Sequence, residues 1–162
     1  MIIFVTRHGK AERDSESGRD EDRALRKRGE RQARWLGEEL ARTGIPPELI
    51  LASPLRRAQE TAAIIAGVVG VGVETEPVLG LGHAASDVLE TLEVRLRADA
   101  PERLMIVGHN PQLESLTGNL TGGATGRPVD LRTGECAVVD VAEPARLLAG
   151  GRLRQLLRLV DK

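Results

Sequence analysis

Two histidines and at least two arginines stand in three short polar segments of the 162-residue sequence. The segments are Arg7-His8-Gly9, residues 53–58 with Arg56 and Arg57, and Gly108-His109-Asn110-Pro111. Guanidinium groups offer forked donors that match phosphate oxygens and stay charged at any working pH. A neutral imidazole is a nucleophile toward phosphorus, and a second one can donate to oxygens that gain charge. Together these residues predict a cationic site for a phosphoryl group, provided that the fold brings them together.

Each polar segment directly follows an apolar, β-prone run that is typical of a buried strand. These runs are residues 2–5, 49–52 and 104–107. Between them, apolar residues recur at helical spacing in residues 29–40, 58–69 and 85–99. Strands that alternate with helices predict an α/β fold, a three-layer α/β/α sandwich with a mainly parallel central sheet. Ligands bind at the carboxyl ends of such strands, so the three segments are expected to meet at one edge.

Other segments predict the sheet edges, the loops and the helix starts. Residues 73–75 are expected to form an edge strand, and residues 135–141 and 153–160 late antiparallel strands. Polar stretches at 10–28 and 119–134 are expected to be loops that wall the site. Ser53 and Asn110 each precede a proline, a pattern that predicts a helix N-cap followed by proline at the first helical position.

The length and composition of the chain argue against several classes of protein. The length fits one domain spanning residues 1–162. A net charge of −1 and 1% aromatic residues argue against a nucleic-acid partner, and no apolar stretch is long enough to span a membrane. Cys136 is the single cysteine, which fits a reducing cytoplasm. No His, Cys and carboxylate cluster has metal-ligand spacing, so we expect neither a metal nor a cofactor, and a monomer is the default expectation.

The three polar segments, in this order, resemble the motifs of the histidine phosphatase superfamily, which has the phosphoglycerate mutase-like fold. The second motif is similar to Ser53-Pro54-x-x-Arg57-Ala58-x-x-Thr61. Within the superfamily, the short chain most resembles the SixA-type phosphohistidine phosphatases. Arg23-Ala24-Leu25 with Gly29 is similar to their segment before the first helix, although Arg26 stands where the family usually has threonine.

The resemblance implies a role for each motif residue. His8 would be the phosphorylated nucleophile, and Arg7, Arg57 and His109 would clamp the phosphate. Gly9 and Asn110 would also bind substrate, with Arg23 at the mouth of the pocket.

The residues themselves bear on two of these assignments, although the choice of Arg57 over Arg56 rests on the spacing of the family motif. Without a side chain at Gly9, the backbone is expected to approach the ligand closely. Arg56 is the alternative to Arg57, because neighbouring helical residues point about 100° apart and only one is expected to enter the site.

A departure from the family indicates the substrate. Many members present a carboxylic acid between the second and third motifs, but residues 77–83 contain none and the next acid is Asp87. An alkoxide leaving group needs a positioned acid, whereas the labile P–N bond of a phosphohistidine needs much less help. The sequence therefore favours a phosphorylated protein, carrying phosphohistidine or another phosphoramidate.

Several alternatives remain open. A small-molecule phosphomonoesterase would need an acid, for which His83 and Glu12 are candidates. A phosphate-recognising module without turnover would keep the same cationic pocket. The basic run at residues 23–34 is interpreted as a solvated face, and alternatively as a surface that docks an acidic face of a phosphorylated protein.

Overall fold

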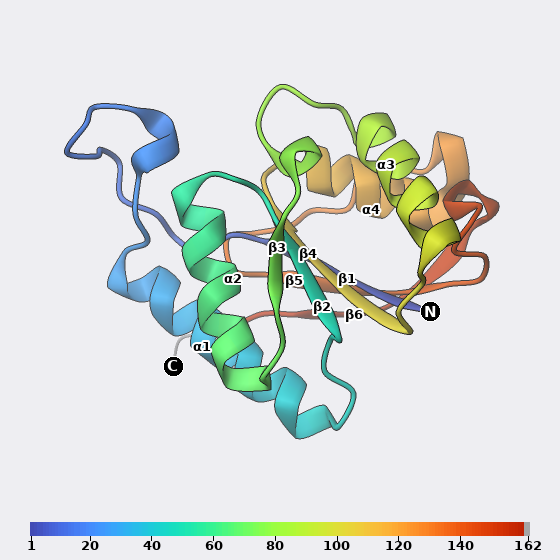
Figure 1. Ribbon diagram of the computed structural model, residues 1–162, viewed down its shortest axis with the longest axis horizontal. Helices are drawn as coiled ribbons and strands as arrows, with labels where there is room; N and C mark the ends of the chain where they lie inside the picture. The colour runs from blue at the N-terminus through green and yellow to red at the C-terminus, as the bar shows by residue number, and fades with distance from the viewer. Residues whose placement is uncertain (161–162) are drawn as a thin grey trace.

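Six strands form one mainly parallel sheet in the computed structural model, which describes residues 1–160 (Figure 1). The strand order is β3-β2-β4-β1-β5-β6. The first four strands in this order run parallel to one another. Strand β5 runs antiparallel to both of its neighbours, β1 and β6. The strands are β1 Ile2–Arg7, β2 Leu49–Ala52, β3 Val73–Thr75, β4 Arg103–Gly108, β5 Cys136–Val141 and β6 Gly151–Leu157. The predicted edge strand and the late antiparallel strands are confirmed, with β6 beginning and ending slightly earlier than expected.

Four α-helices cover the two faces of this sheet. They are α1 Lys27–Thr43, α2 Arg56–Val69, α3 Ala85–Ala98 and α4 Gln112–Gly122. The first two lie on one face and the last two on the other (Figure 1). Side chains alternate along β1, so Phe4 packs into the core under α1 and α2 while Ile3 and Val5 pack into the core under α3 and α4. The predicted three-layer sandwich is confirmed.

The strand register aligns the three polar segments at one edge of the sheet. In the parallel pair of β1 and β4, Arg7 lies opposite Gly108, so His8 and His109 follow side by side. In the pair of β2 and β4, Ala52 lies opposite Val107, and the Ser53 amide donates to the Val107 carbonyl at 2.9 Å. The expected meeting of the segments is confirmed.

The two predicted helix caps are wrong. The N-cap of α2 is Leu55 and that of α4 is Pro111, and neither residue has a side-chain capping bond. The Ser53 hydroxyl contacts His109 and accepts a bond from the Leu55 amide. The Asn110 amide donates to the Leu131 carbonyl and to the Glu114 carboxylate. Both short polar side chains therefore bond across the edge of the sheet, and neither is the N-cap residue of its helix.

The predicted loops contain more regular structure than expected. Helix α4 continues to Gly122 and is followed by a 3₁₀ turn, so only the later part of residues 119–134 is irregular. Residues 10–28 include a 3₁₀ turn at Asp20–Asp22, a bridge between Ala11 and Leu25, and the first residues of α1. This loop projects from the body of the molecule (Figure 1). Arg26 is the N-cap of α1 but makes no side-chain cap.

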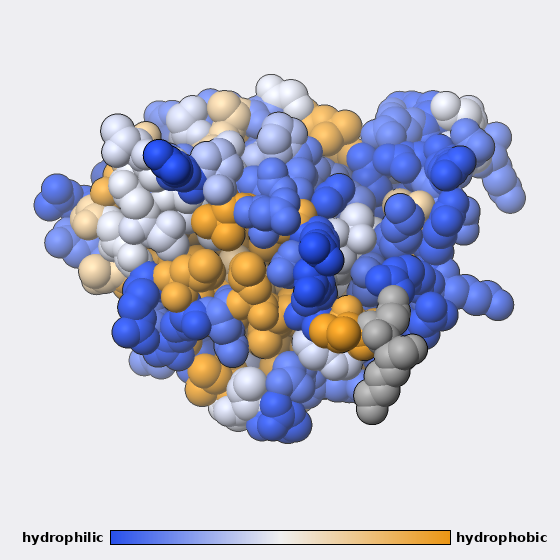
Figure 2. All heavy atoms as spheres, turned by 180° about the vertical axis from the view of Figure 1, so that it is seen from behind, coloured by the Kyte–Doolittle hydropathy of each residue, from blue (hydrophilic) through white to orange (hydrophobic). Residues whose placement is uncertain are grey.

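The face seen from behind carries a band of apolar residues flanked by polar ones (Figure 2). Exposed apolar side chains of the chain include Leu148, Leu156 and Val160. Within residues 1–160, no helix is both long and apolar enough to cross a lipid bilayer.

Candidate active site

A cavity of about 280 Å³ opens at the carboxyl ends of β1, β2 and β4. The four residues predicted to act on phosphate all line it, and Arg23 and Asn110 line it too. The complete lining is Arg7, His8, Lys10, Ala11, Arg23, Arg57, Leu81, His109, Asn110 and Thr133. Four of these side chains are cationic and none is acidic, so this phosphate cavity suits a multiply charged anion.

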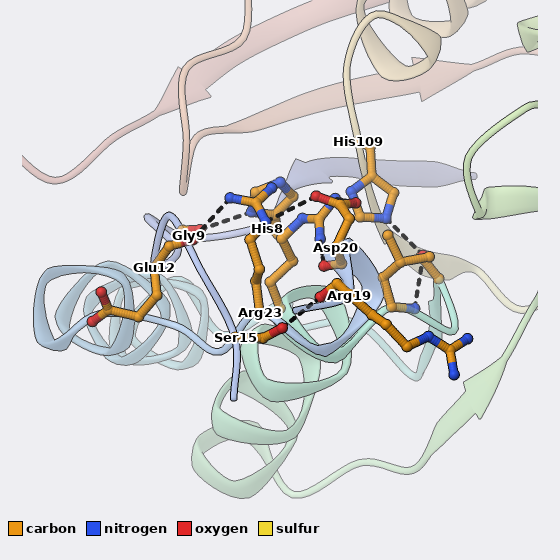
Figure 3. Close-up of polar contacts among 11 residues, drawn as sticks. His8, Gly9, Glu12, Ser15, Arg19, Asp20, Arg23 and His109 are labelled. Carbon is orange, nitrogen blue, oxygen red and sulfur yellow. Dashed lines mark hydrogen bonds and ion pairs between the residues drawn. The ribbon is translucent and has the colours of Figure 1, made fainter. Parts of the chain in front are cut away.

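The buried His8 ring is held in one tautomer. Its Nδ1 lies 2.7 Å from the carbonyl oxygen of Gly9, which can only accept, so Nδ1 carries the hydrogen and Nε2 the lone pair. Burial is the largest cause that lowers the pKa of His8 to about 4; the Gly9 bond opposes it, and the charges of Arg57 and Arg7 add to it. The ring is therefore neutral near pH 7, with an Nε2 that can attack phosphorus (Figure 3).

His109 is held through its other nitrogen. Its Nε2 lies 2.7 Å from the hydroxyl oxygen of Ser53, which also accepts a bond from the Leu55 amide at 3.2 Å. We assign the Ser53 hydroxyl as the donor to Nε2, because among residues 1–160 it has no other acceptor. His109 then carries its hydrogen on Nδ1, which is buried and unpartnered. Burial, followed by the proximity of His8 and Arg57, lowers the pKa of His109 to about 3.

The two arginines keep donors free inside the cavity. Arg57 is 4% exposed and binds the Asp20 backbone oxygen at 2.9 Å and the Asp20 carboxylate at 3.1 Å. Arg7 donates to the Leu131 carbonyl at 3.1 Å. The Nε atoms of both arginines are buried without a partner. Together with Nδ1 of His109 they form a set of unsatisfied donors that an anion would satisfy. Arg56 is exposed, which supports the choice of Arg57.

Gly9 allows a close contact between two backbone segments. A Cβ atom at Gly9 would lie 2.7 Å from the backbone oxygen of Gly29, so the missing side chain lets the His8 loop approach α1. The Gly9 amide donates to the Thr61 hydroxyl at 3.0 Å, and that hydroxyl donates to the Arg57 carbonyl at 2.7 Å. This chain of bonds holds the His8 loop against α2 and gives Thr61 its role, whereas the close backbone approach accounts for Gly9 and Gly29.

Asn110 uses both of its amide hydrogens within the protein. Its Nδ2 donates to the Glu114 carboxylate at 2.8 Å and to the Leu131 carbonyl at 2.7 Å. The same Leu131 carbonyl accepts the bond from Arg7. Asn110 thus lines the cavity with both amide hydrogens already used within the protein. It positions the carbonyl that orients Arg7.

Comparison with known proteins places the fold and the sequence in one family. Residues 3–80 match the histidine phosphatase superfamily (branch 1). An uncharacterized protein of Picosynechococcus sp. is 33% identical over 134 residues, which cover 82% of this chain and 80% of that relative. The chain belongs to the histidine phosphatase superfamily. It is therefore a histidine-dependent phosphatase.

Solved structures show the same fold at lower sequence identity. The protein histidine phosphatase SixA, solved with tungstate, superposes with a TM-score of 0.84 and 22% identity over 98% of this chain and 97% of that one. The alpha-ribazole phosphatase of Shigella flexneri superposes with a TM-score of 0.71 and 21% identity, covering 96% of each chain. The fold of this histidine phosphatase is thus shared by enzymes whose names indicate a protein substrate and a small-molecule substrate.

Asp20 is the residue of the site that the sequence argument missed. Its carboxylate lies between Arg57 and Arg23, whose Nε donates to it at 2.9 Å (Figure 3). Partial burial would raise the pKa of Asp20, but the hydrogen bonds and charges of the two arginines outweigh it and lower the pKa. The run of three acids directly before Arg23 was the signal in the sequence.

Neither predicted general acid lines the phosphate cavity. Glu12 is exposed and its carboxylate pairs with Arg26 at 3.4 Å, pointing away from His8 (Figure 3). Its backbone oxygen accepts a bond from Arg23 at 2.8 Å, which ties the loop to the mouth of the cavity. His83 is exposed and lines a neighbouring cavity.

Proposed function

We propose that the protein hydrolyses phosphoryl groups in two steps through a covalent intermediate on His8. Nε2 of the neutral His8 attacks phosphorus as the bond to the leaving group breaks. Water then attacks phospho-His8, which releases inorganic phosphate and regenerates the imidazole. Arg7, Arg57 and Nδ1 of His109 hold the non-bridging oxygens, whose charge increases in the transition state. The tautomer of His8 and the three unpartnered donors support this assignment.

We propose phosphohistidine in a protein as the substrate. The observation that carries this proposal is the state of Asp20, which the two arginines hold as a carboxylate and not as an acid. No residue of the phosphate cavity within 1–160 is Asp or Glu. An alkoxide would find no carboxylic acid in this cavity, whereas the nitrogen of a phosphoramidate accepts a proton readily from solvent.

The test is a comparison of kcat/KM on a phosphohistidine peptide and on a panel of sugar phosphates, nucleotides and aryl phosphates, without added metal. We expect the phosphohistidine peptide to be preferred by orders of magnitude. A preference for an alkyl monoester would overturn the substrate assignment and leave the covalent mechanism standing.

A small-molecule phosphomonoesterase is the second candidate, and the position of Asp20 favours it. When a substrate phosphate takes the donors of Arg57, Asp20 loses that partner and lies near a dianion, which favours its protonated form. The variant Asp20→Asn separates the two functions. A collapse of kcat on monoesters alone would identify Asp20 as the leaving-group acid, and an unchanged kcat on phosphohistidine with tighter phosphate binding supports the first candidate.

A further inference from the structure

A second cavity of about 280 Å³ adjoins the phosphate cavity. The two share Leu81, His109 and Asn110, so a ligand held in one can extend into the other without leaving the protein surface. The remaining lining comes from the segment before α3 and from the start of α4. It comprises Gly80, Gly82, His83, Ala84, Ala85, Pro111, Gln112 and Ser115.

The two cavities differ in charge. Arg7, Lys10, Arg23 and Arg57 line the phosphate cavity, whereas the second cavity has no Lys, Arg, Asp or Glu among its lining residues in the described chain. A carboxylate or a second phosphate placed there would lose water without gaining a cationic partner, which is costly. The second cavity therefore suits an uncharged group.

The side chains that line the second cavity are mostly small, and few of them can donate a hydrogen bond. Four of the eleven lining residues are glycine or alanine, which leaves room for a ring. Both amide hydrogens of Gln112 are used by the carbonyls of Val78 and His83, at 3.0 and 2.9 Å, so this amide cannot bind the hydroxyls of a sugar as a donor. Leu81 is 54% exposed at the junction of the two cavities, where a bound apolar surface would cover it.

We infer that the second cavity receives the leaving group of the substrate, and that this group is a compact, uncharged ring without a second anion. The imidazole of a phosphohistidine side chain meets this description, and bisphosphates, nucleoside di- and triphosphates and phosphorylated carboxylic acids do not. The inference rests on the proposed function, because it assigns the phosphoryl group to the cationic cavity and the group bonded to it to the uncharged one.

Binding of two phosphonates tests this without turnover, because attack at phosphorus does not hydrolyse their P–C bond. The probes are benzylphosphonate and 4-carboxybenzylphosphonate, which differ by one carboxylate, measured by calorimetry with inorganic phosphate as reference. We expect benzylphosphonate to bind about tenfold more tightly, because the carboxylate must be desolvated. Equal affinities in the wild-type protein would overturn the inference.

Variants at Ser115 locate the effect. Ser115 is half-buried on α4 and lines the second cavity but not the phosphate cavity. Ser115→Phe is expected to weaken benzylphosphonate about tenfold by filling the cavity, with inorganic phosphate unchanged. Ser115→Lys is expected to remove the discrimination against 4-carboxybenzylphosphonate. The matched control is Val94→Lys, which adds the same charge on α3 at a side chain that lines neither cavity. This control should still discriminate against 4-carboxybenzylphosphonate.

The outcomes separate this inference from the proposed function. Loss of phosphate binding in Ser115→Phe, to the same degree as loss of benzylphosphonate, would show a fold defect or a single shared cavity and would contradict two subsites. Retained discrimination between the phosphonates with no turnover of phosphohistidine would refute the proposed substrate and leave the uncharged subsite in place.

Discussion

The ends of strands β1 and β4 each carry a buried histidine, and they differ in which ring nitrogen the protein holds. A backbone carbonyl accepts from Nδ1 of His8, which leaves a lone pair on Nε2. A hydroxyl contacts Nε2 of His109, which leaves a hydrogen on Nδ1. The rings lie 5.1 Å apart between centroids, and burial lowers the pKa of both. Two identical side chains on adjacent strands thus become a nucleophile and a hydrogen-bond donor through their neighbours alone.

Replacing the nucleophile is expected to cause the largest loss of activity. His8→Ala removes the only lone pair that we assign to attack, so kcat is expected to fall by at least about 10⁴-fold. Inorganic phosphate should still bind, because Arg7, Arg57 and His109 remain. Steady-state kinetics and calorimetry with phosphate check both parts. Substantial turnover in this variant would refute the nucleophile assignment.

Replacing the donor has a smaller effect. His109→Gln removes the Nδ1–H from the transition state, and kcat is expected to fall by about 10²–10³-fold, as for other lost oxyanion donors. A phospho-His8 intermediate should still form, but slowly, as single-turnover kinetics would reveal. If His109→Gln abolishes the intermediate while His8→Ala retains it, the two roles are reversed.

Removing the hydroxyl that orients His109 has a smaller effect again. Ser53→Ala deletes the bond to Nε2 and is expected to lower kcat about fivefold to tenfold, which corresponds to about 1 kcal/mol. The ring is then free to move its hydrogen to Nε2, so the ¹⁵N chemical shifts of His109 should show a mixture of tautomers. An unchanged tautomer would mean that Ser53 does not set it. Ser86→Ala, at an exposed hydroxyl on α3, is the control.

The pH dependence of stability reports on both rings together. Their pKa values of about 4 and about 3 lie below the ordinary 6.5, so the unfolded chain binds more protons once pH falls below 6.5. The free energy of unfolding is expected to decrease from pH 6.5 toward pH 4, by up to about 1.4 kcal/mol per pH unit for each ring.

Urea unfolding between pH 7 and pH 5 measures this slope. His8→Asn should reduce it by about half, whereas His83→Asn, at an exposed ring, should leave it unchanged. If His83→Asn changed the slope as much as His8→Asn, the pH dependence of the free energy of unfolding could not be assigned to the buried rings.

The sequence predicted the site best where chemistry follows directly from a buried strand. Arg7, His8 and His109 stand immediately after or at the end of strands whose apolar runs are unambiguous, so parallel pairing was enough to bring them together. Arg57 is the second residue of α2 and does not directly follow β2, and its distinction from Arg56 came from the family motif.

The failures have physical causes. A serine or asparagine before proline fits a helix cap as well as a contact to a distant group, and only the tertiary structure shows that Ser53 contacts His109. Asp20 lies in a short 3₁₀ turn of a polar loop, whose path across the sheet edge no periodicity reveals. The contact of Gly9 with Gly29 joins two elements that are distant in sequence, so Gly9 alone suggested proximity to a ligand.

Direct trapping of the phosphorylated enzyme tests the central claim. Wild-type protein mixed with a labelled phosphohistidine peptide would be quenched in alkali within one turnover and analysed by mass spectrometry, because a phosphohistidine survives alkali. The account predicts one phosphoryl group on Nε2 of His8 and none in His8→Ala. Label on His109 or His83, or turnover without any labelled protein, would contradict it.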